Sequence, residues 1–396
     1  MDTQREVVVA SGVRTAVGRF GGALKDLPPT ELGAKVVREA VSRSGVDPTE
    51  VGHTVFANVI HTHVRDMYLA RVVSVNGGLP VETPALTVNR LCGSGLQAIV
   101  SASQMLILGD CDVAVAGGTE SMSRGAYWVP GARWGERMGD GKLIDATVGA
   151  LTDPFDDCHM GVTAENVSEQ WGVTREDQDA FAVQSHQRAA RAHEEGRFDS
   201  QILPIEVRKR KETVTFDTDE HVRADASMES MAKLKPVFKG DGNVTAGNSA
   251  GINDGAAAVV LMDRAYAEAN GHTPMARLVS YGFAGVEPSI MGVGPIGAIR
   301  QALDRVDLKA DDMDVIELNE AFAAQALAVM RDLGLSEDRT NPNGSGISLG
   351  HPIGATGAIL TVKALHELER IDGRYALVTM CIGGGQGIAA VFERMS

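Results

Sequence analysis

Short runs of β-branched and other strand-forming residues recur along the whole chain, and helical patterns separate several of them. Strands that alternate with helices are typical of α/β proteins, in which helices cover both faces of a sheet. The sequence therefore predicts an α/β fold. The runs expected to form strands are Glu6–Ala10, Thr54–Val59, Ala85–Val88, Asp112–Gly117, Ala256–Met262, Ala276–Tyr281, Asp314–Asn319, Tyr375–Cys381 and Gly387–Phe392. The expected helices run from an N-cap at Thr30 to Gly45, from an N-cap at Thr174 to near Gly196, and from about Gly357 to Gly373.

A faint internal duplication divides this pattern in two. Asn89–Gly95 precedes an apolar helix and a strand that ends in Ala116–Gly118. Asn341–Gly346 precedes another helix and a strand that ends in Ile382–Gly384. Two similar α/β halves would bring their glycine-rich turns together, and we expect a site where these turns meet.

The middle of the chain has a different character. Strand-like runs thin out from residue 123 to 248, and Arg208–His221 is rich in charge, which indicates loops and helices inserted into the α/β scaffold. With 396 residues the chain is two to three times as long as a typical domain of ~150 residues. The predicted division is an N-terminal half of residues 1–122 with 252–272, an inserted loop domain of residues 123–251, and a C-terminal half of residues 273–396.

The charge of the chain limits its partners. Lys and Arg number 37 and Asp and Glu number 52, so the net charge at neutral pH is −15. Because like charges repel, we expect no nonspecific binding to nucleic acid and no adhesion to an anionic membrane. A local basic patch that binds an anionic ligand is still compatible with this negative net charge.

The cysteines and the N-terminus indicate a reducing, cytoplasmic environment. No CxxC spacing occurs, and no charged segment followed by a long apolar one begins the chain, so we expect free thiols and no signal peptide. The uncharged stretch from Leu91 to Gly109 contains serine, glutamine and glycine, which favours a buried helix over a membrane span. The cysteines are Cys92, Cys111, Cys158 and Cys381.

Cys92 follows a strand-like run and precedes a helix. The positive end of the helix dipole at this position favours a thiolate. The flanking Gly93 and Gly95 leave room for a thioester and expose backbone N–H groups that could hold an oxyanion. Cys92 is therefore a candidate nucleophile, with an ordinary packing role as the alternative.

Two further glycine-rich turns carry candidate reactive groups. Cys381–Gly387 follows a strand, and its glycines do not match the GxGxxG pattern of dinucleotide binding. His351 lies in a turn between Ser348 and Gly357 that could hold the imidazole as a base. Asn319 ends an apolar strand, where it would either orient a water or an oxyanion or cap a helix.

Other polar features leave alternatives open. The basic run Arg208–Lys211 is either solvated or a phosphate contact, and Arg223 is an alternative for that contact. The small-residue loop Gly247–Gly255 fits the floor of a channel as well as an ordinary turn. No metal site is predicted, because metal-ligand spacing is absent from the nearest candidates, which are His61, His63, Cys158 and His159.

Together these segments resemble the thiolase family, the CoA-dependent acetyl- and acyltransferases. The motifs stand in family order over the full length of the chain, which is most similar to bacterial β-ketothiolases of polyester (polyhydroxyalkanoate) and short-chain or fatty acyl metabolism. The matching motifs are NRLCGSG from Asn89, AGGTESMS from Ala116, HMGVTAEN from His159, GNSAGINDGAA from Gly247, NEAFA from Asn319, GHPIGATG from Gly350 and CIGGGQG from Cys381.

The resemblance implies a role for each reactive group. Cys92 matches the nucleophile that carries the acyl group. His351 matches the residue that activates this nucleophile and, with a water held at Asn319, forms the first oxyanion hole. Cys381 matches the acid/base that removes the α-proton of the second acyl-CoA or returns it in thiolysis. The backbone N–H groups of Cys92 and Gly383 match the second oxyanion hole. Residue chemistry agrees, because Claisen condensation needs a nucleophile, a base and donors for two oxyanions.

The resemblance also implies coenzyme A and acyl-CoA as substrates and no permanently bound cofactor. The implied contacts are Arg223 and Ser230 to the adenine nucleotide, and His159, Met160, Met291 and Phe322 to pantetheine or the acyl group. Ser249 and Ala250 are expected beside pantetheine as well. Many family members have serine where this chain has Ala250, so a hydroxyl contact from residue 250 is not expected.

The family fold implies the two α/β halves and a loop domain that binds CoA and contacts other subunits of a homotetramer, a dimer of dimers. Trp128 and Trp134, in a Gly- and Arg-rich loop, would suit such a contact or lie on the surface. Direction and acyl chain length stay open, although an apolar pocket is indicated by Met67, Tyr68, Leu151, Met160 and Met291.

Three other functions compete with the thiolase interpretation. A decarboxylating condensing enzyme of fatty-acid or polyketide type would use Cys with His and Asn or a second His. Papain-like hydrolysis is suggested only by Cys92-Gly-Ser, and a noncatalytic CoA or lipid carrier would be expected to lack a catalytic residue. The joint presence of Cys92, His351 and Cys381 favours a thiolase.

Overall fold

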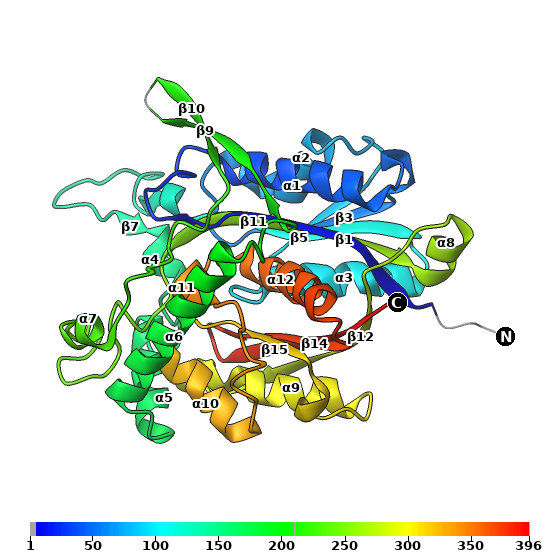
Figure 1. Cartoon of the computed structure of the whole chain (residues 1–396). Coiled ribbons are helices and arrows are strands. Elements are labelled where there is room, and N and C mark those ends of the chain that lie inside the picture. The colour runs from blue at the N-terminus through cyan, green and yellow to red at the C-terminus, as the bar shows by residue number, and fades with distance from the viewer. Residues whose placement is uncertain (1–4, 210, 396) are drawn as a thin grey trace.

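The computed structural model describes residues 5–209 and 211–395, which form alternating layers of helices and sheet (Figure 1). The main sheet runs in the order β13-β14-β15-β12-β1-β11-β5-β3-β4. β1 joins the two parts of this sheet by pairing with β12 at Val8–Arg277 and Val9–Ala276. Helices cover the outer faces of both parts and fill the space between them, as an α/β fold requires.

The N-terminal half builds one part of the sheet and its helices. Each strand predicted for this half is present, although the first, predicted as Glu6–Ala10, extends five residues further to Thr15. Its strands are β1 (Val7–Thr15), β3 (His53–Ala57), β4 (Ala85–Val88), β5 (Val113–Ser121) and β11 (Asn253–Asp263). Its helices are α1 (Pro29–Ser44), α2 (Leu69–Asn76), α3 (Ser94–Leu108) and α8 (Arg264–Ala269). The short strand β2 (Gly18–Arg19) pairs with β11.

The C-terminal half repeats this arrangement. Its strands are β12 (Ala276–Gly285), β13 (Val315–Leu318), β14 (Tyr375–Ile382) and β15 (Gln386–Arg394). Its helices are α9 (Gly294–Asp304), α10 (Ala323–Leu333), α11 (Gly346–Leu349) and α12 (Thr356–Ile371). The order β12-β15-β14-β13 corresponds to β1-β11-β5-β3, and in both halves two antiparallel pairings are followed by a parallel one. The predicted fold of two similar layered halves is therefore confirmed.

The helices α3 and α12 form the central layer, where they pack against each other between the two parts of the sheet (Figure 1). Their backbones touch at two glycines. A Cβ atom on Gly95 would lie 2.6 Å from the backbone nitrogen of Ala358, and one on Gly357 would lie 2.2 Å from that of Leu96. By length and composition Leu91–Leu108 could cross a membrane, but 56% of it is buried and it packs between β3, β5 and α12 as a core helix.

Helix caps agree with the sequence in two places and differ in one. Thr174 caps α6 (Arg175–Glu194) in a capping box with Asp177, and Gly45 ends α1 in the left-handed conformation, as predicted. Thr30 does not cap α1. The helix already begins at Pro29, because proline fixes φ near its helical value and lacks the N–H that a cap would satisfy.

The region between the halves consists mainly of loops and short elements. Its helices are α4 (Ala146–Ala150), α5 (Met160–Gln170), α6 and α7 (Met228–Ala232). Its strands are β6 (Tyr127–Trp128), β7 (Ile144–Asp145), β8 (Ile202–Leu203), β9 (Ile205–Lys209) and β10 (Glu212–Phe216). The charged segment expected to be a loop is largely the projecting β9–β10 hairpin, although Arg210 lies outside the described residues. In β9, Ile205 and Val207 are buried and alternate with exposed residues, and Phe216 of β10 is buried opposite Ile205. This alternation explains why the segment forms strands.

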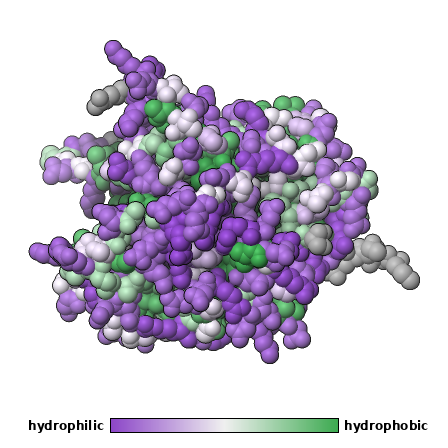
Figure 2. Space-filling model, viewed as in Figure 1, coloured by the Kyte–Doolittle hydropathy of each residue, from purple (hydrophilic) through white to green (hydrophobic). Residues whose placement is uncertain are grey.

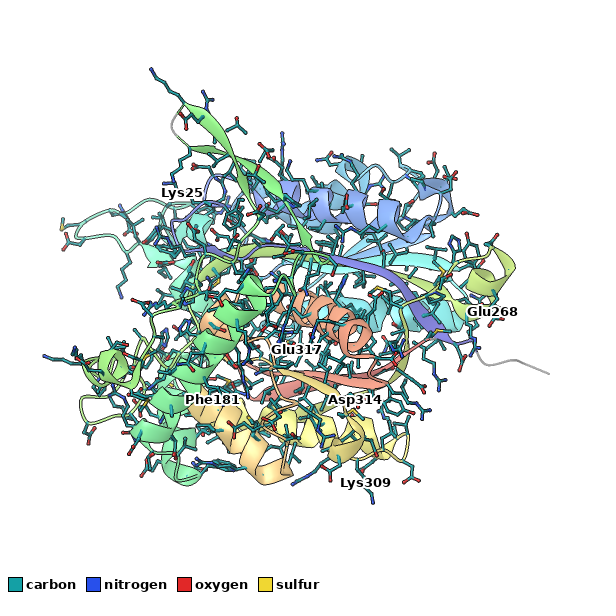
Figure 3. All side chains as sticks on the ribbon, in the orientation of Figure 1. Lys25, Phe181, Glu268, Lys309, Asp314 and Glu317 are labelled. Carbon is teal, nitrogen blue, oxygen red and sulfur yellow. The ribbon has the colours of Figure 1, made fainter. Side chains whose placement is uncertain are left out.

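The surface agrees with the acidic, polar composition. The face shown in Figure 2 is mainly hydrophilic, and its hydrophobic groups lie in small, separate patches. Side chains cover the layers on all sides in Figure 3, in which Glu268 and Lys309 lie at the periphery and Glu317 in the interior. Glu317 is fully buried and pairs with Lys363 at 2.7 Å.

Candidate active site

The glycine-rich turns of the two halves meet at one pocket of about 390 Å³. Cys92 and His351 lie in its wall, although they are far apart in the sequence. The inserted region and the turns of the C-terminal half supply most of the remaining wall, which is largely apolar. The lining residues are Cys92, Met122, Leu151, His159, Met160, His221, Arg223, Val237, Phe238, Ala246, Ser249, Ala250, Gly251, Ile252, Met291, Ala321, Phe322, His351 and Ile353.

Cys92 lies half-buried in the turn between β4 and α3. Burial raises the pKa of the Cys92 thiol, and hydrogen bonds from the backbone N–H groups of Gly383 and of Cys92 itself oppose this rise with a smaller effect. The raised pKa runs against the expectation of a thiolate at the helix terminus, because burial disfavours the charged form of the thiol. The neutral thiol needs a base before it can attack a thioester.

Cys381 is the penultimate residue of β14 and lies directly behind the pocket wall. It is fully buried, and its side chain belongs to the same apolar cluster as Met160, Met291 and Phe322, which line the pocket. The pKa of Cys381 lies well above its usual value because burial and the nearby Cys92 both disfavour a second negative charge. The structure thus brings the two predicted cysteines together.

His351 is held in one tautomer by Thr356. His351 Nδ1 lies 2.7 Å from Thr356 Oγ, and this hydroxyl donates its only hydrogen to the carbonyl of Pro352 at 2.9 Å. With its hydrogen on Pro352, Thr356 accepts a hydrogen bond from Nδ1–H, and we assign the lone pair to Nε2, which faces Asn319 Nδ2 at 3.4 Å. Burial lowers the pKa of His351 to about 4, so the ring is neutral at pH 7 and has an unprotonated nitrogen, and the same burial makes it a weaker base than a solvated histidine.

Asn319 follows β13 and lies beside the imidazole. Its Nδ2 is 3.4 Å from His351 Nε2, and its backbone N–H donates to the carbonyl of Thr379 at 3.0 Å. Among the described residues, the buried Oδ1 of Asn319 has no hydrogen-bond partner. A buried polar atom in this state suits an ordered water, which agrees with the sequence expectation for this position.

Two buried residues hold the turns of the site and were not predicted. Glu120, at the end of β5, accepts hydrogen bonds from Gly354 at 2.8 Å and from a loop of the N-terminal half, and burial raises the pKa of its carboxyl to about 8. Asn253 accepts the backbone N–H of His351 at 3.0 Å. Glu120 lies in the motif AGGTESMS and Asn253 in GNSAGINDGAA, both of which contributed to the family resemblance. Their place in these motifs is the sequence signal that could have indicated a role.

The positions expected to contact CoA lie in the pocket wall with one exception. Ser230 is not among the lining residues, and its hydroxyl closes the capping box of α7 with Ser227. The hydroxyl of Ser249 donates to the carbonyl of Thr245 at 2.7 Å. The positions in the wall are His159, Met160, Arg223, Ser249, Ala250, Met291 and Phe322.

His221 and Phe238 also line the pocket and were not predicted. Burial, with a contribution from the Arg223 charge, lowers the pKa of His221 to about 4, so this ring is neutral. Phe238 stacks on His159 with ring centroids 4.8 Å apart. No motif marks either residue, because their place in the wall depends on how the inserted region folds back over the two halves.

The basic run lies elsewhere. Arg208 and Lys209 line a separate hollow of about 680 Å³ between the β9–β10 hairpin and the loop around Gly21, and no predicted catalytic residue lies in its wall. Arg223 is the cation of the catalytic pocket. Across residues 5–209 and 211–395, no cluster of three or more histidine, cysteine or carboxylate side chains could hold a metal ion.

Two thiols and a neutral imidazole at an apolar pocket, on paired α/β halves, are the parts that covalent catalysis by a cysteine nucleophile requires. The family model described as "Thiolase, N-terminal domain" matches residues 7–265, and "Thiolase, C-terminal domain" matches residues 272–394. The chain belongs to the thiolase family.

Named relatives agree with this assignment over the full length. The chain is 64% identical over 392 residues to the β-ketothiolase BktB of Cupriavidus necator, a match that covers 99% of this chain and 100% of the relative. It is 50% identical to an acetyl-CoA acetyltransferase of Pseudomonas aeruginosa, over 98% of this chain and 100% of the relative.

Solved structures share the fold. The acetyl-CoA acetyltransferase of Bacillus anthracis superposes with a TM-score of 0.98 at 45% identity and covers 100% of both chains. Human mitochondrial 3-ketoacyl-CoA thiolase in complex with CoA superposes with a TM-score of 0.96 at 44% identity and covers 99% of both chains. Of the functions left open by the sequence, these matches support the thiolase and make this chain an acyltransferase.

Proposed function

We propose that this thiolase condenses acetyl-CoA with a short acyl-CoA to a 3-ketoacyl-CoA, and runs the reverse thiolysis, through an acyl group carried on Cys92. The observation that carries the proposal is the surroundings of the Cys92 thiol. It shares one pocket with the fixed Nε2 lone pair of His351, and the N–H groups of Gly383 and Cys92 point at its sulfur. A base and two backbone N–H donors therefore converge on one nucleophile, and the same N–H groups can bind the carbonyl oxygen once the sulfur has attacked the thioester.

In acylation, His351 Nε2 takes the proton of Cys92 and the thiolate attacks the thioester carbonyl. The N–H groups of Cys92 and Gly383 stabilise the tetrahedral oxyanion. When this intermediate collapses, Cys381 gives its proton to the leaving CoA sulfur. The acyl-enzyme then holds a Cys381 thiolate beside a protonated His351, and the opposite charges stabilise each other in the buried site.

In condensation, the Cys381 thiolate removes the α-proton of acetyl-CoA. The protonated Nε2 of His351 and a water at Asn319 stabilise the enolate, which attacks the acyl carbonyl on Cys92. Collapse of the second tetrahedral intermediate releases the 3-ketoacyl-CoA and a Cys92 thiolate, which regains its proton from His351. All three groups return to their neutral resting states, so the protons balance over the cycle.

Coenzyme A enters as a substrate through the inserted region, residues 123–251, and no permanently bound cofactor is needed for these steps. Arg223 provides a positive charge for the nucleotide phosphates, and Ser230 contacts the adenine nucleotide. His159, Met160, Met291 and Phe322 border pantetheine and the acyl group, as do Ser249 and Ala250. The CoA complex of the human mitochondrial relative supports CoA as the ligand.

The cellular setting is part of the proposal and is supported by the family and the relatives. We place the enzyme in the cytoplasm, in polyhydroxyalkanoate or fatty acid metabolism, as a homotetramer. Trp128 and Trp134 are 57% and 87% exposed on the loop that projects beside β7 (Figure 1), and exposed tryptophans of this kind are common in subunit contacts. Sedimentation of Trp134→Ala at equilibrium tests this contact, because a smaller assembly is expected.

Mass spectrometry after mixing with acetyl-CoA tests the chemistry. The unmodified chain should gain one acetyl group on Cys92, and Cys92→Ala should gain none and lose turnover. Cys381→Ala should still become acetylated but should not complete condensation. Full turnover by Cys92→Ala would reject the proposal, and equal loss of both half-reactions in Cys381→Ala would reject the role of Cys381.

A further inference from the structure

The strand that leads to Asn319 lies at the edge of the main sheet, and a later part of the chain covers this edge. Ile316 of β13 donates its N–H to the carbonyl of Arg339 at 2.8 Å, and Asn341 donates its N–H to the carbonyl of Ile316 at 2.8 Å. Thr340 forms a parallel bridge with Ile316. Residues 339–341 thus pair with β13 like one more strand.

The side chain of Asn341 continues this pairing where the backbone turns away. Its Oδ1 accepts the N–H of Leu318 at 2.9 Å, and its Nδ2 donates to the carbonyl of Leu318 at 2.8 Å. The amide therefore replaces the backbone of the next strand residue and fixes both peptide groups that flank Leu318, immediately before Asn319. Asn341 adopts the left-handed conformation with φ of 50°, which costs energy and persists because these contacts hold it.

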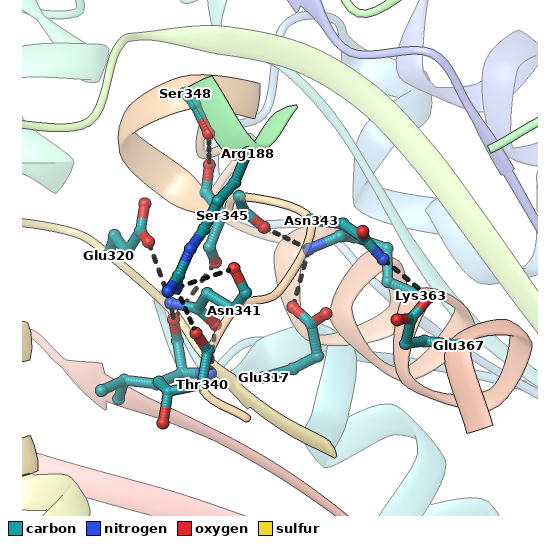
Figure 4. A network of polar contacts seen from close by, with 12 residues as sticks. Arg188, Glu317, Glu320, Thr340, Asn341, Asn343, Ser345, Ser348, Lys363 and Glu367 are labelled. Atoms are coloured by element: carbon teal, nitrogen blue, oxygen red, sulfur yellow. Dashed lines mark hydrogen bonds and ion pairs between the residues drawn. The ribbon is translucent and has the colours of Figure 1, made fainter. Parts of the chain in front are cut away.

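Glu320 connects Asn341 to the segment that carries His351. Its carboxylate is buried and accepts Asn341 Nδ2 on one oxygen at 3.0 Å (Figure 4). The other oxygen accepts the N–H of Ile347 at 3.2 Å. Ser185 of α6 donates to the latter oxygen at 2.6 Å. Ile347 lies in α11, the short helix that leads directly into the His351 turn.

We infer that Asn341, supported by Glu320, is a positioning residue that sets the spacing of Asn319 and His351. The inference rests on the proposed roles of these two residues. The end of β13 and the start of the His351 turn are tied to the same amide and carboxylate, so neither segment can shift without breaking buried hydrogen bonds. The space is tight as well: a Cβ atom on Gly346 would lie 2.7 Å from Asn319 Oδ1. Oxyanion donors stabilise a transition state only when they are held in place, so the spacing of Asn319 and His351 should affect the catalytic rate.

Three variants separate positioning from stability. Asn341→Ala removes the amide, and Asn341→Gly removes it while relieving the left-handed backbone. Asn343→Ala is the matched control, because this neighbouring amide is equally buried but bonds to Glu367 at 2.8 Å and not to β13. Each purified variant is assayed for thiolysis of acetoacetyl-CoA and for thermal unfolding by circular dichroism.

We expect kcat per folded protein to fall by about 10- to 100-fold in both Asn341 variants, with KM changed by less than about threefold. Asn341→Gly should unfold at a higher temperature than Asn341→Ala yet remain as slow, and Asn343→Ala should lose stability but keep its kcat. The inference is wrong if kcat follows the unfolding temperature across the three variants, or if Asn341→Ala keeps its kcat.

A fourth variant separates this inference from the proposed function. Asn319→Ala removes the proposed water-binding group itself and should be at least as slow as Asn341→Ala. If Asn319→Ala keeps full activity, the proposed role of Asn319 fails. If Asn319→Ala is slow and Asn341→Ala is not, only the positioning role fails.

Discussion

The turns that lead into α3 and α12 occupy equivalent places in the two halves, but they fix different groups. Each helix begins with a hydroxyl residue. Ser94 of α3 accepts the N–H of Arg90 at 2.7 Å and donates to the carbonyl of Leu91 at 2.6 Å, so it braces only its own backbone. Thr356 of α12 instead accepts from the His351 ring.

This difference explains how a duplicated framework yields an asymmetric site. The N-terminal turn presents a thiol against backbone N–H groups, and the C-terminal turn presents an imidazole in a single tautomer. The shared feature is the close contact of the two helices at Gly95 and Gly357, which brings both turns to one pocket. Substitutions of Gly95 and Gly357 test the contact that the halves share, and substitutions of Ser94 and Thr356 test the difference between the two turns.

The largest effect is expected where the halves touch. Gly357→Ala would place a methyl group 2.2 Å from the backbone nitrogen of Leu96, which cannot rotate away. The helices must separate, and the free energy of unfolding should fall by about 3 kcal/mol or more, with Gly95→Ala similarly affected. Urea unfolding followed by tryptophan fluorescence measures the loss.

Gly149→Ala is the control for these substitutions. This glycine lies in α4, and a Cβ atom there would have nothing within 4 Å. Its stability should be unchanged or slightly higher, because alanine favours a helix. Unchanged stability in Gly357→Ala would contradict the close approach of the central helices.

The next effect concerns the tautomer of His351. Thr356→Val keeps the shape of the side chain but removes the acceptor for Nδ1–H. Acylation should slow by about 10- to 100-fold, less than the full 10²–10⁴ that a general base contributes. Thr356→Ser should restore most of the rate. The acylation rate is measured as CoA release from acetyl-CoA by stopped flow. If Thr356→Ser is as slow as Thr356→Val, the loss is due to packing and not to the hydrogen bond.

Ser94→Ala should behave in the opposite way. Loss of the hydroxyl removes the acceptor of the half-buried Arg90 N–H, while the Leu91 carbonyl still accepts the Ser94 N–H at 3.0 Å, so the free energy of unfolding should fall by about 1 kcal/mol. Because Ser94 does not touch the His351 ring, its acylation rate should change less than that of Thr356→Val. The same unfolding and stopped-flow measurements apply, and a larger rate loss in Ser94→Ala would break the distinction between the two turns.

The smallest effect is a difference in pH dependence. His351 has a folded pKa of about 4, below its ordinary value of about 6.5, so between these values the unfolded chain binds more protons and stability falls as pH falls. His351→Asn removes this contribution. When the pH is lowered from 6 to 5, the free energy of unfolding should therefore decrease by about 1 kcal/mol less in this variant than in the unmodified chain. The pKa of Cys92 is raised, so the thiol stays neutral here in both states and Cys92→Ala should keep the original slope. Urea unfolding at the two pH values measures both slopes.

The sequence was most informative where local geometry determines the structure. β4 was predicted with its observed bounds, and the N-cap at Thr174 was recognised because a cap acts within the first turn of its own helix. The family motifs located Cys92, His351 and Cys381. Sequence reasoning failed for the β9–β10 hairpin, whose charged side chains concealed its alternating buried residues, and for the protonation of Cys92, whose burial depends on distant segments.

The sequence by itself determined the candidate reactive groups of the site: Cys92, Cys381, His351 and Asn319, each in a glycine-rich turn or at the end of a strand. It also determined the repeated order of strands and helices, because periodicity and turn chemistry act over a few residues. Only the tertiary structure decided that these groups are neutral at rest, that Thr356 fixes the histidine tautomer, and that Asn341 and Glu320 tie Asn319 to the His351 turn. Burial and hydrogen bonding between distant segments set these properties, and neither exists until the two halves pack together.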